Sequence, residues 1–223
     1  MKRIRHLEHR EIFELDLAEK KIVDWSFFSC KFIKCNFLGA KLRQCQFDYC
    51  EFVECDASNV TLGYSHFIDA LGAKLRQCQF DSCEFVECDA SNVTLGYSHF
   101  IDARFIECKL LGLNWVDVSS PLKLAFNKCR LDYNVFSNNN LSGLEFIQCL
   151  LRDAFFQNCD LTRSSFYGSD LFHAEFEECK LNYADMTDVI NFNISPEKND
   201  ISYAVMSIDS ALMLLRKYHL TIR

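Results

Sequence analysis

The sequence predicts a solenoid, a rod of short stacked units that bury their apolar side only against their neighbours. The first observation is a column of mostly large apolar residues that recurs every five positions through Phe27, Phe32, Phe37, Leu42, Phe47, Phe52, Ala57, Leu62 and Phe67. The second is a column of mostly small residues two positions earlier, formed by Trp25, Cys30, Cys35, Ala40, Cys45, Cys50, Cys55, Val60 and Ser65. Neither the helical period of about 3.6 residues nor the strand period of about 2 produces such columns.

The column changes phase twice along the chain. The first change is a step of eight residues from Phe67 to Leu75, where five or ten would keep the phase. The second is a step of eleven residues from Trp115 to Phe126. This second step predicts a loop or bulged corner at about residues 116–122.

The first phase change coincides with an internal duplication. Residues 38–70 are repeated at once as residues 71–103, and the two copies differ only at Tyr49 and Ser82. Near identity over this length indicates a recent or an engineered duplication. Because the length of the repeated block is not a multiple of five, we predict that three extra residues bulge out around residues 68–72.

The cysteines share one position of the repeat. Alanine and serine fill the same position elsewhere, so the position selects a small side chain that can be buried. This predicts buried, reduced thiols and a reducing compartment, with neither disulfides nor metal. All thirteen cysteines of the chain follow this rule, namely Cys30, Cys35, Cys45, Cys50, Cys55, Cys78, Cys83, Cys88, Cys108, Cys129, Cys149, Cys159 and Cys179.

The pattern divides the chain into three parts. Residues 1–14 precede the clean repeat and are expected to cap the open N-terminal end, which would otherwise expose apolar side chains and unpaired backbone. Residues 15–190 form the repeat body. Residues 191–223 are expected to form a connection, a last strand and a short helix whose N-cap is Ser207 or Asp209.

Composition narrows the possible partners and surroundings. Seven Gly and two Pro are few for a chain with so many turns, which predicts corners built from ordinary residues. The net charge of −7 argues against nucleic acid as a direct partner and favours a basic protein, although an acidic surface can also serve solubility alone. The start, "MKRIRHLEHR", lacks the apolar segment of a signal peptide, and no run is long enough to span a membrane. A cytoplasmic protein is expected.

The side chains do not form a recognisable catalytic constellation. No Ser or Cys has a base placed by a motif, and no Gly-rich loop is arranged to bind phosphate. Thiols that are buried at every repeat are also poor nucleophiles. We therefore expect a protein that is not an enzyme and that needs no cofactor.

Acidic residues dominate the outward positions of the duplicated block. Ten acidic residues stand there against four basic ones, which makes a negative rod. Duplex DNA is also a negative rod, with one charge per ~1.7 Å of its axis. The acidic faces are the expected partner-binding surface, with Asp48, Glu51, Glu54, Asp56, Asp81, Glu84, Glu87 and Asp89 as the candidate contacts.

The repeat resembles the pentapeptide-repeat family, whose motif is A-(D/N)-L-x-x. Units such as "CKFIK", "CNFLG", "AKLRQ", "CQFDY" and "CEFVE" carry the resemblance, which covers nearly the whole chain. It implies an all-β fold, a right-handed quadrilateral β-helix with one unit per side and four units per coil, followed here by a short C-terminal α-helix.

Some segments resemble the albicidin-immunity branch of this family most, namely "FIECKLLGLNWVDVSS", "DLTRSSFYGSDL" and the tail "DVINFNI…NDISYAVMSIDSALMLL". That branch, the quinolone-resistance (Qnr) proteins and the mycobacterial fluoroquinolone-resistance proteins act on DNA gyrase and topoisomerase IV. The resemblance implies a DNA mimic that binds these enzymes and confers resistance to a topoisomerase-targeting antibiotic or toxin. A loop containing Asp117, Ser119, Ser120 and Pro121 would tune drug release.

The C-terminal helix has two interpretations. Its apolar residues either cap the final coil alone or combine capping with a two-fold homodimer contact, as in several bacterial members of the family. We favour the second. The general alternatives to the topoisomerase hypothesis are an interaction scaffold with another partner and an engineered elongation of a natural solenoid. The residues expected at the dimer interface are Ala211, Leu212, Leu214 and Leu215.

Overall fold

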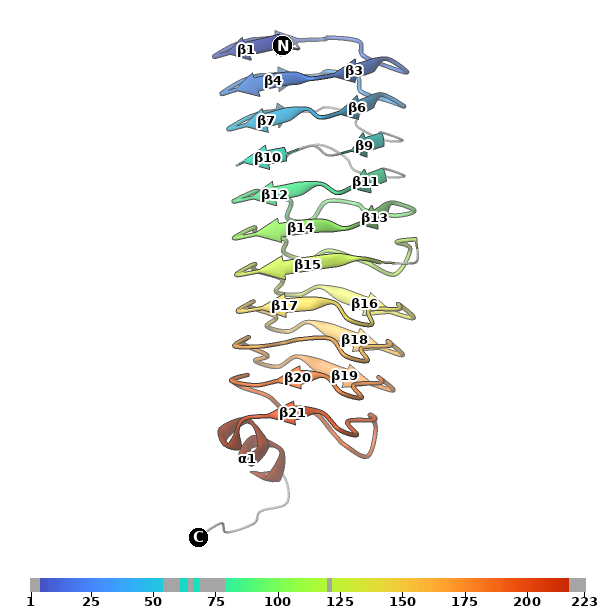
Figure 1. Ribbon diagram of the computed structural model, residues 1–223, viewed down its shortest axis with the longest axis vertical. Helices are drawn as coiled ribbons and strands as arrows, with labels where there is room; N and C mark the ends of the chain where they lie inside the picture. The colour runs from blue at the N-terminus through green and yellow to red at the C-terminus, as the bar shows by residue number, and fades with distance from the viewer. Residues whose placement is uncertain (1–4, 54–60, 64–65, 69–78, 120–121, 217–223) are drawn as a thin grey trace.

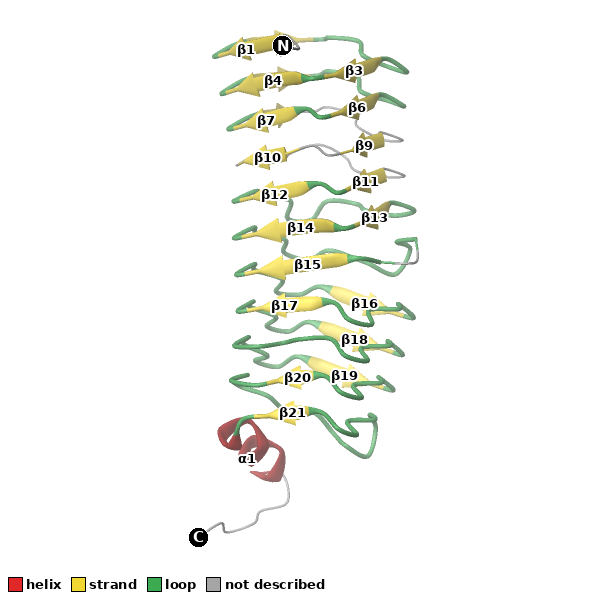
Figure 2. Cartoon of the chain, viewed as in Figure 1, coloured by secondary structure: helices red, strands yellow, loops and turns green. Residues whose placement is uncertain are grey.

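The protein is a straight rod of stacked coils (Figure 1). The computed structural model describes residues 5–53, 61–63, 66–68, 79–119 and 122–216. Within these residues the chain consists of short strands, connecting turns and one helix at the C-terminal end (Figure 2). Every strand pair is parallel, and a regular coil of four units separates successive partners, as between Phe27 and Phe47. This is the predicted right-handed quadrilateral β-helix.

The four sides of the rod are numbered here in chain order. Side 1 carries β1 (Arg5–Glu8), β4 (Trp25–Phe28), β7 (Gln46–Asp48), β10 (His66–Ile68), β12 (Glu84–Val86), β14 (Ala103–Ile106), β15 (Leu124–Asn127), β17 (Glu145–Ile147), and then β20 (Asp185–Met186) and β21 (Val205–Met206). Side 2 carries β2 (Glu11–Phe13), β5 (Lys31–Ile33) and β8 (Glu51–Val53). Side 3 carries β16 (Val135–Ser137), β18 (Phe155–Gln157) and β19 (Glu175–Glu177). Side 4 carries β3 (Lys21–Val23), β6 (Lys41–Arg43), β9 (Thr61–Gly63), β11 (Gln79–Asp81) and β13 (His99–Ile101).

The core is a set of vertical stacks of the repeating apolar residue. Phe156 is fully buried between Phe136 and Phe176, with ring centroids 4.8 and 4.7 Å apart and the rings nearly parallel. A matching stack on side 1 joins Phe85 to Phe105 at 4.7 Å. Such aromatic pairs stabilise by about 0.5–1.5 kcal/mol beyond the area that they bury. The column therefore holds neighbouring coils together.

The column of small residues does more than fill space. The Cys108 Sγ donates a hydrogen bond to the carbonyl oxygen of Phe85 in the preceding coil, at 3.3 Å. Ser169 makes the same bond to Phe146 through its Oγ, at 2.6 Å. The position therefore favours a small hydrogen-bond donor, which explains why Cys exchanges with Ser there.

The predicted burial of the cysteines is confirmed for those that the structure describes, because all eleven of them are buried. Burial raises the pKa of the Cys50 thiol to about 12. Such a thiol stays protonated and unreactive near neutral pH.

The prediction that corners do not depend on glycine is also confirmed. Non-glycine residues occupy the left-handed corner position along the whole described rod, for example Glu87 (φ 55°), Lys128 (φ 53°) and Tyr133 (φ 62°). This conformation costs an L-residue roughly 1–2 kcal/mol. The ladder hydrogen bond at each corner offsets the cost, as between the Glu87 amide and the carbonyl of Ile106 at 2.9 Å.

The N-terminal boundary differs from the predicted one. Residues 5–13 already form β1 and β2, which pair in register with β4 and β5 of the next coil. Leu7 and Ile12 pack against the core from these strands. The first coil therefore already includes residues 5–13, inside the segment that was expected to form a separate cap. Its apolar residues keep the five-residue spacing, but they lack the Phe and Cys that mark the later repeats.

The predicted three-residue bulge at the duplication is wrong. Residues 69–72 lie outside the described residues, but the pairing on either side of them is defined. Phe67 pairs with Phe85, and Leu62 pairs with Phe80, so this coil is two residues shorter than the regular one. A bulge would have made the coil three residues longer than the regular one and set Phe67 against Ala90. The shorter coil keeps an aromatic residue against an aromatic residue.

Candidate functional site

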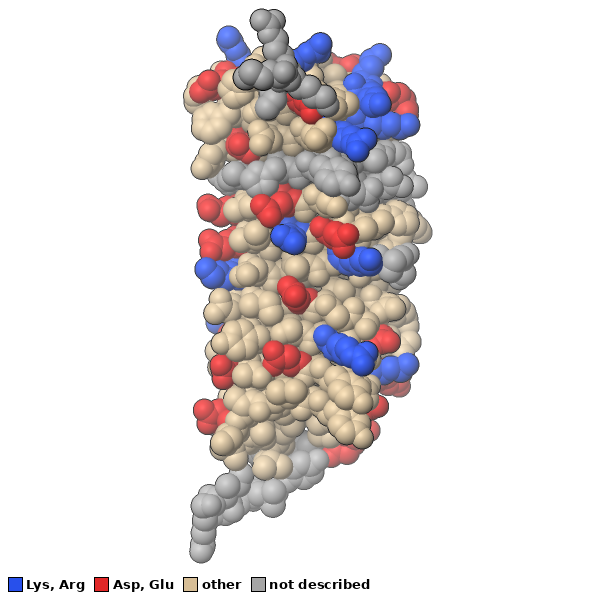
Figure 3. Space-filling model, viewed as in Figure 1, with Lys and Arg blue, Asp and Glu red and all other residues tan. Residues whose placement is uncertain are grey.

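The charged residues are unevenly distributed along the rod. Residues 5–50 contain eight basic and seven acidic side chains, whereas residues 80–216 contain ten basic and twenty acidic ones. Blue side chains accordingly gather at the N-terminal end of the face in Figure 3. The acidic excess therefore begins within the duplicated block and continues through the coils that follow it.

The eight predicted acidic contacts do not converge on one side. Asp48 and Glu84 lie half-buried on side 1, Glu87 is exposed at the next corner, and Asp89 is exposed on side 2. The remaining four cannot be placed in this way. Glu51 and Asp81 belong to β8 and β11 but their side chains are not described, and Glu54 and Asp56 lie outside the described residues.

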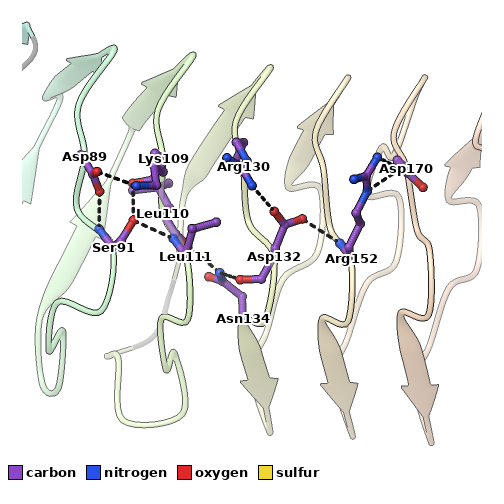
Figure 4. Close-up of polar contacts among 10 residues, drawn as sticks. All are labelled: Asp89, Ser91, Lys109, Leu110, Leu111, Arg130, Asp132, Asn134, Arg152 and Asp170. Carbon is purple, nitrogen blue, oxygen red and sulfur yellow. Dashed lines mark hydrogen bonds and ion pairs between the residues drawn. The ribbon is translucent and has the colours of Figure 1, made fainter.

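Side 2 of the later coils carries a ladder of compensated charges, drawn in Figure 4. The Lys109 Nζ lies 2.9 Å from the Asp89 carboxylate of the preceding coil. The Arg152 guanidinium lies 2.8 Å from Asp170 of the following coil, and the Arg152 amide donates to Asp132 at 3.2 Å. Side 2 is therefore nearly neutral in this region, although acidic residues are frequent on it.

Carboxylates on sides 2 and 4 also hold the backbone turns. Asp89, Asp160 and Asp200 each accept a hydrogen bond from the amide two residues further on, at 3.0 Å. Burial raises the pKa of Asp160, but the bonds from Thr162 outweigh it and bring that pKa below its usual value. A count of acidic residues cannot distinguish these turn-forming Asp residues from free surface charges. A signal for the turns was present, because the second position of the A-(D/N)-L-x-x motif is Asp or Asn.

A smaller group of acidic residues is available for a partner. Glu145 lies on side 1, Glu175 lies on side 3, and Glu178 lies at the following corner, all of them exposed. Within the part of the chain that the structure describes, none of the three forms an ion pair. They belong to the coils with the acidic excess, yet no sequence pattern distinguishes them from their acidic neighbours.

The predicted loop is a small change in coil length. Phe105 pairs with Phe126, so this coil is one residue longer than the regular coil. The Tyr97 amide donates to the carbonyl of Asp117 at 2.6 Å, and the Ser119 amide donates to the carbonyl of Ser98 at 2.9 Å. Asp117 and Ser119 therefore stay in contact with the preceding coil, whereas Ser120 and Pro121 lie outside the described residues.

Helix α1 (Ile208–Arg216) closes the C-terminal end. It begins at the predicted N-cap, where the Ser207 Oγ accepts from the Ser210 amide at 3.4 Å. Met213 and Leu214 pack against the core, which is the capping role. Of the other residues expected at a dimer interface, Ala211 and Leu212 are half-buried and Leu215 is exposed.

The end of the rod also presents apolar side chains to solvent. Val205, just before the helix, is 58% exposed, and Ile208 at its first turn is 80% exposed. Large apolar residues this exposed are typical of a contact surface when they cluster. Neither was predicted, because the expected dimer contacts were taken from the apolar run of the helix that starts at Ala211.

Comparisons with known proteins agree with this architecture. A model of "pentapeptide repeats (8 copies)" matches residues 26–63, and a model of a "pentapeptide repeat region" matches residues 122–186. Two trypsin-treated forms of QnrB1, a plasmid-mediated fluoroquinolone resistance protein, have similar structures, with TM-scores of 0.55 and 0.50 at 16% and 18% identity. Each of the two matches covers 98% of this chain and 98% of the QnrB1 chain. HetL, a pentapeptide-repeat protein of the cyanobacterium Nostoc, reaches a TM-score of 0.40 at 19% identity over 91% of this chain and 85% of its own. No curated protein sequence matches this chain.

The fold and the matched repeats together define the class of the protein. The chain belongs to the pentapeptide-repeat family. Its likeness to QnrB1 is one of fold. Among the described residues, the helix is too short to cross a membrane.

Proposed function

We propose that this chain is a non-enzymatic, dimeric DNA mimic that acts in the cytoplasm. It binds DNA gyrase or topoisomerase IV and protects the enzyme from a topoisomerase-targeting antibiotic or toxin. The observation that carries the proposal is the acidic excess of the later coils, twenty acidic against ten basic residues over 80–216, on a rigid rod. A basic surface that binds duplex DNA can bind such a rod through the same charges. The fold shared with a fluoroquinolone resistance protein supports the choice of target.

A second candidate is an interaction scaffold with a partner unrelated to topoisomerases. The compensated ladder on side 2 favours it, because Asp89 and Asp170 are engaged in ion pairs and turns. In this case the acidic residues serve the fold and solubility.

Gyrase supercoiling, titrated with this protein in the presence and absence of a quinolone, tests the first function. We expect rescue from the drug at low dose or inhibition of supercoiling at high dose. The double variant Glu145→Lys, Glu175→Lys should weaken gyrase binding by about tenfold or more, since it reverses two exposed charges. The matched control Glu11→Lys, Glu14→Lys changes the net charge equally on the N-terminal coils and should bind like the parent. Equal effects of the two variants would favour the scaffold.

A second experiment asks whether the duplication alters the fit. Phe67, Phe85 and Phe105 lie on successive rungs of side 1. Without residues 71–103, Phe105 would follow Phe67 by five residues and move to the next side. The deletion therefore shortens the rod and turns the later coils by one side relative to the earlier ones. An effect on gyrase supercoiling that is seen only after the deletion would mean that the duplication prevents the rod from fitting the DNA-binding surface of the enzyme. Inactivity of both proteins would contradict the topoisomerase role.

The proposed dimer rests on the exposed apolar residues at the end of the rod. Ile208→Asp or Leu215→Asp should give monomers in sedimentation, because a carboxylate would be buried in the contact. The control Val116→Asp alters an exposed apolar residue in the loop and should leave the dimer intact. A dimer that survives both helix substitutions would place the contact elsewhere.

A further inference from the structure

The N-terminal coils carry a cluster of basic side chains on side 4. Lys20, Lys21, Lys41 and Arg43 are all exposed there, and this group is called the basic patch below. Lys21 and Val23 of β3 pair with Lys41 and Arg43 of β6, so the patch extends over two neighbouring rungs. Figure 3 shows blue side chains gathered beside these strands, at the upper right.

The stacking of these charges is unfavourable for the fold. Lys21 lies directly opposite Lys41, and neighbouring rungs are ~4.8 Å apart. Like charges in directly opposed positions destabilise a sheet. Side 2 of the same coils shows the favourable arrangement, since Lys31 stands between Glu11 and Glu51. Packing alone gives no reason for the basic patch.

The surrounding acidic groups do not cancel the basic patch. Glu19 and Asp24 occupy the corners on either side of β3, and the Glu19 carboxylate lies against Gly39. Two acidic groups against four basic ones leave an excess of positive charge. Asp48 in the next coil lies on side 1, and along side 4 the next acidic strand residue is Asp81 of β11, two rungs or ~10 Å beyond β6. This is about one Debye length at physiological salt, so the net charge of the whole chain does not decide the local potential.

We propose that the basic patch binds the phosphodiester backbone of duplex DNA. Lys41 and Arg43 project from one strand two residues apart, ~7 Å, which is similar to the distance between adjacent phosphates of one DNA strand. The planar guanidinium of Arg43 can donate two parallel hydrogen bonds to a phosphate, and Lys21 supplies a charge on the next rung. Contacts of this kind position a protein on DNA without reading its sequence.

The rigid spacing favours DNA over an acidic polypeptide. An extended chain of carboxylates is flexible and must lose conformational entropy to match two fixed rungs. A duplex presents its phosphates already ordered. DNA binding by the basic patch needs no topoisomerase, so the experiment below tests it independently of the proposed function. The net charge of the chain argued against nucleic acid as a direct partner, but the basic patch has a local charge of the opposite sign.

The test is fluorescence anisotropy of a labelled DNA duplex with the full-length protein, from about 50 to about 200 mM salt. With three to four phosphate contacts, we expect a slope of log affinity against log salt of about −3. Lys21→Glu with Lys41→Glu should weaken binding by about tenfold or more at the lower salt concentration. Lys123→Glu with Lys180→Glu changes the net charge equally on the later coils and should bind like the parent.

The single variant Lys21→Glu separates binding from folding. It sets a carboxylate opposite Lys41, so it should raise thermal stability while it lowers DNA affinity. Three outcomes would overturn the proposal: no binding at low salt, an equal loss in the control on the later coils, or displacement of the DNA by polyglutamate as readily as by unlabelled duplex.

Discussion

The earlier coils (residues 5–50) and the later coils (residues 80–216) are built from the same repeat, but they differ in the residues at the inward small position and in how their surface charges are paired. In the earlier coils the inward small position is mostly Cys, and Lys21 stands opposite Lys41 on side 4. In the later coils Asn and Ser enter the inward position, and Lys109 is paired with Asp89 of the preceding coil. The backbone ladder tolerates both solutions because inward and outward side chains are separated at every unit. Core packing and surface charge can therefore vary independently along this rod.

The largest expected effect is loss of a core ring in the later coils. Phe156→Ala removes a fully buried ring from between Phe136 and Phe176 and should destabilise by about 3–5 kcal/mol. Ile12→Ala, in the half-buried first coils, should cost far less. Urea unfolding of the two variants measures the difference. Similar losses would mean that the first coils are packed as firmly as the later ones.

The next effect compares the inward donors on side 3. The Asn134 Nδ2 donates to the Leu110 carbonyl at 2.6 Å, and its Oδ1 accepts from the Trp115 Nε1 at 2.7 Å. Asn134→Ala leaves these buried groups without partners and should cost about 2–3 kcal/mol. Cys35→Ala, at the equivalent position, removes only the weak thiol bonds to the carbonyls of Ile12 and Ile33 and should cost less than half as much. An equal cost in chemical denaturation would mean that volume, and not hydrogen bonding, decides the position.

Low pH should remove the stability that the ion pairs of the ladder on side 2 contribute. Burial raises the pKa of Asp170, but hydrogen bonds from Asn191 and Arg152 prevail and lower it below its usual value. A lowered folded-state pKa means that the group contributes its stability above the unfolded value of ~3.9 and loses it as pH falls through the folded value. Asp170→Asn should therefore flatten the fall in melting temperature below about pH 4. The exposed control Glu178→Gln should leave that fall unchanged.

The smallest effect concerns the like-charged pair on side 4. Lys21→Glu should stabilise the protein by about 0.2–1 kcal/mol, because it replaces a repulsive cross-strand pair by an attractive one. The gain should shrink at high salt, where exposed charges are screened. A loss of melting temperature in low salt would mean that Lys21 has a stabilising contact of its own.

Much of the architecture follows from the sequence, because burial in a stacked rod requires the same residue type at every repeat. The five-residue column, the small buried position and the corners without glycine all follow from this requirement. The candidate surface was harder to predict. Whether an acidic residue is exposed, paired or part of a turn depends on residues one whole coil away, as with Asp89 and Lys109 or Glu107 and Lys128.

The length of the irregular coils could not be predicted from the sequence alone. A five-residue period cannot distinguish a coil with three extra residues from one with two fewer, because both restore the same phase. The tertiary structure decides between them through the pairing of Phe67 with Phe85. The physical reason is that this register sets two aromatic residues opposite each other, whereas a bulge would set Phe67 opposite the small Ala90. Which sides of the earlier and later coils share one face of the rod depends on that choice, and with it the surface that a partner meets.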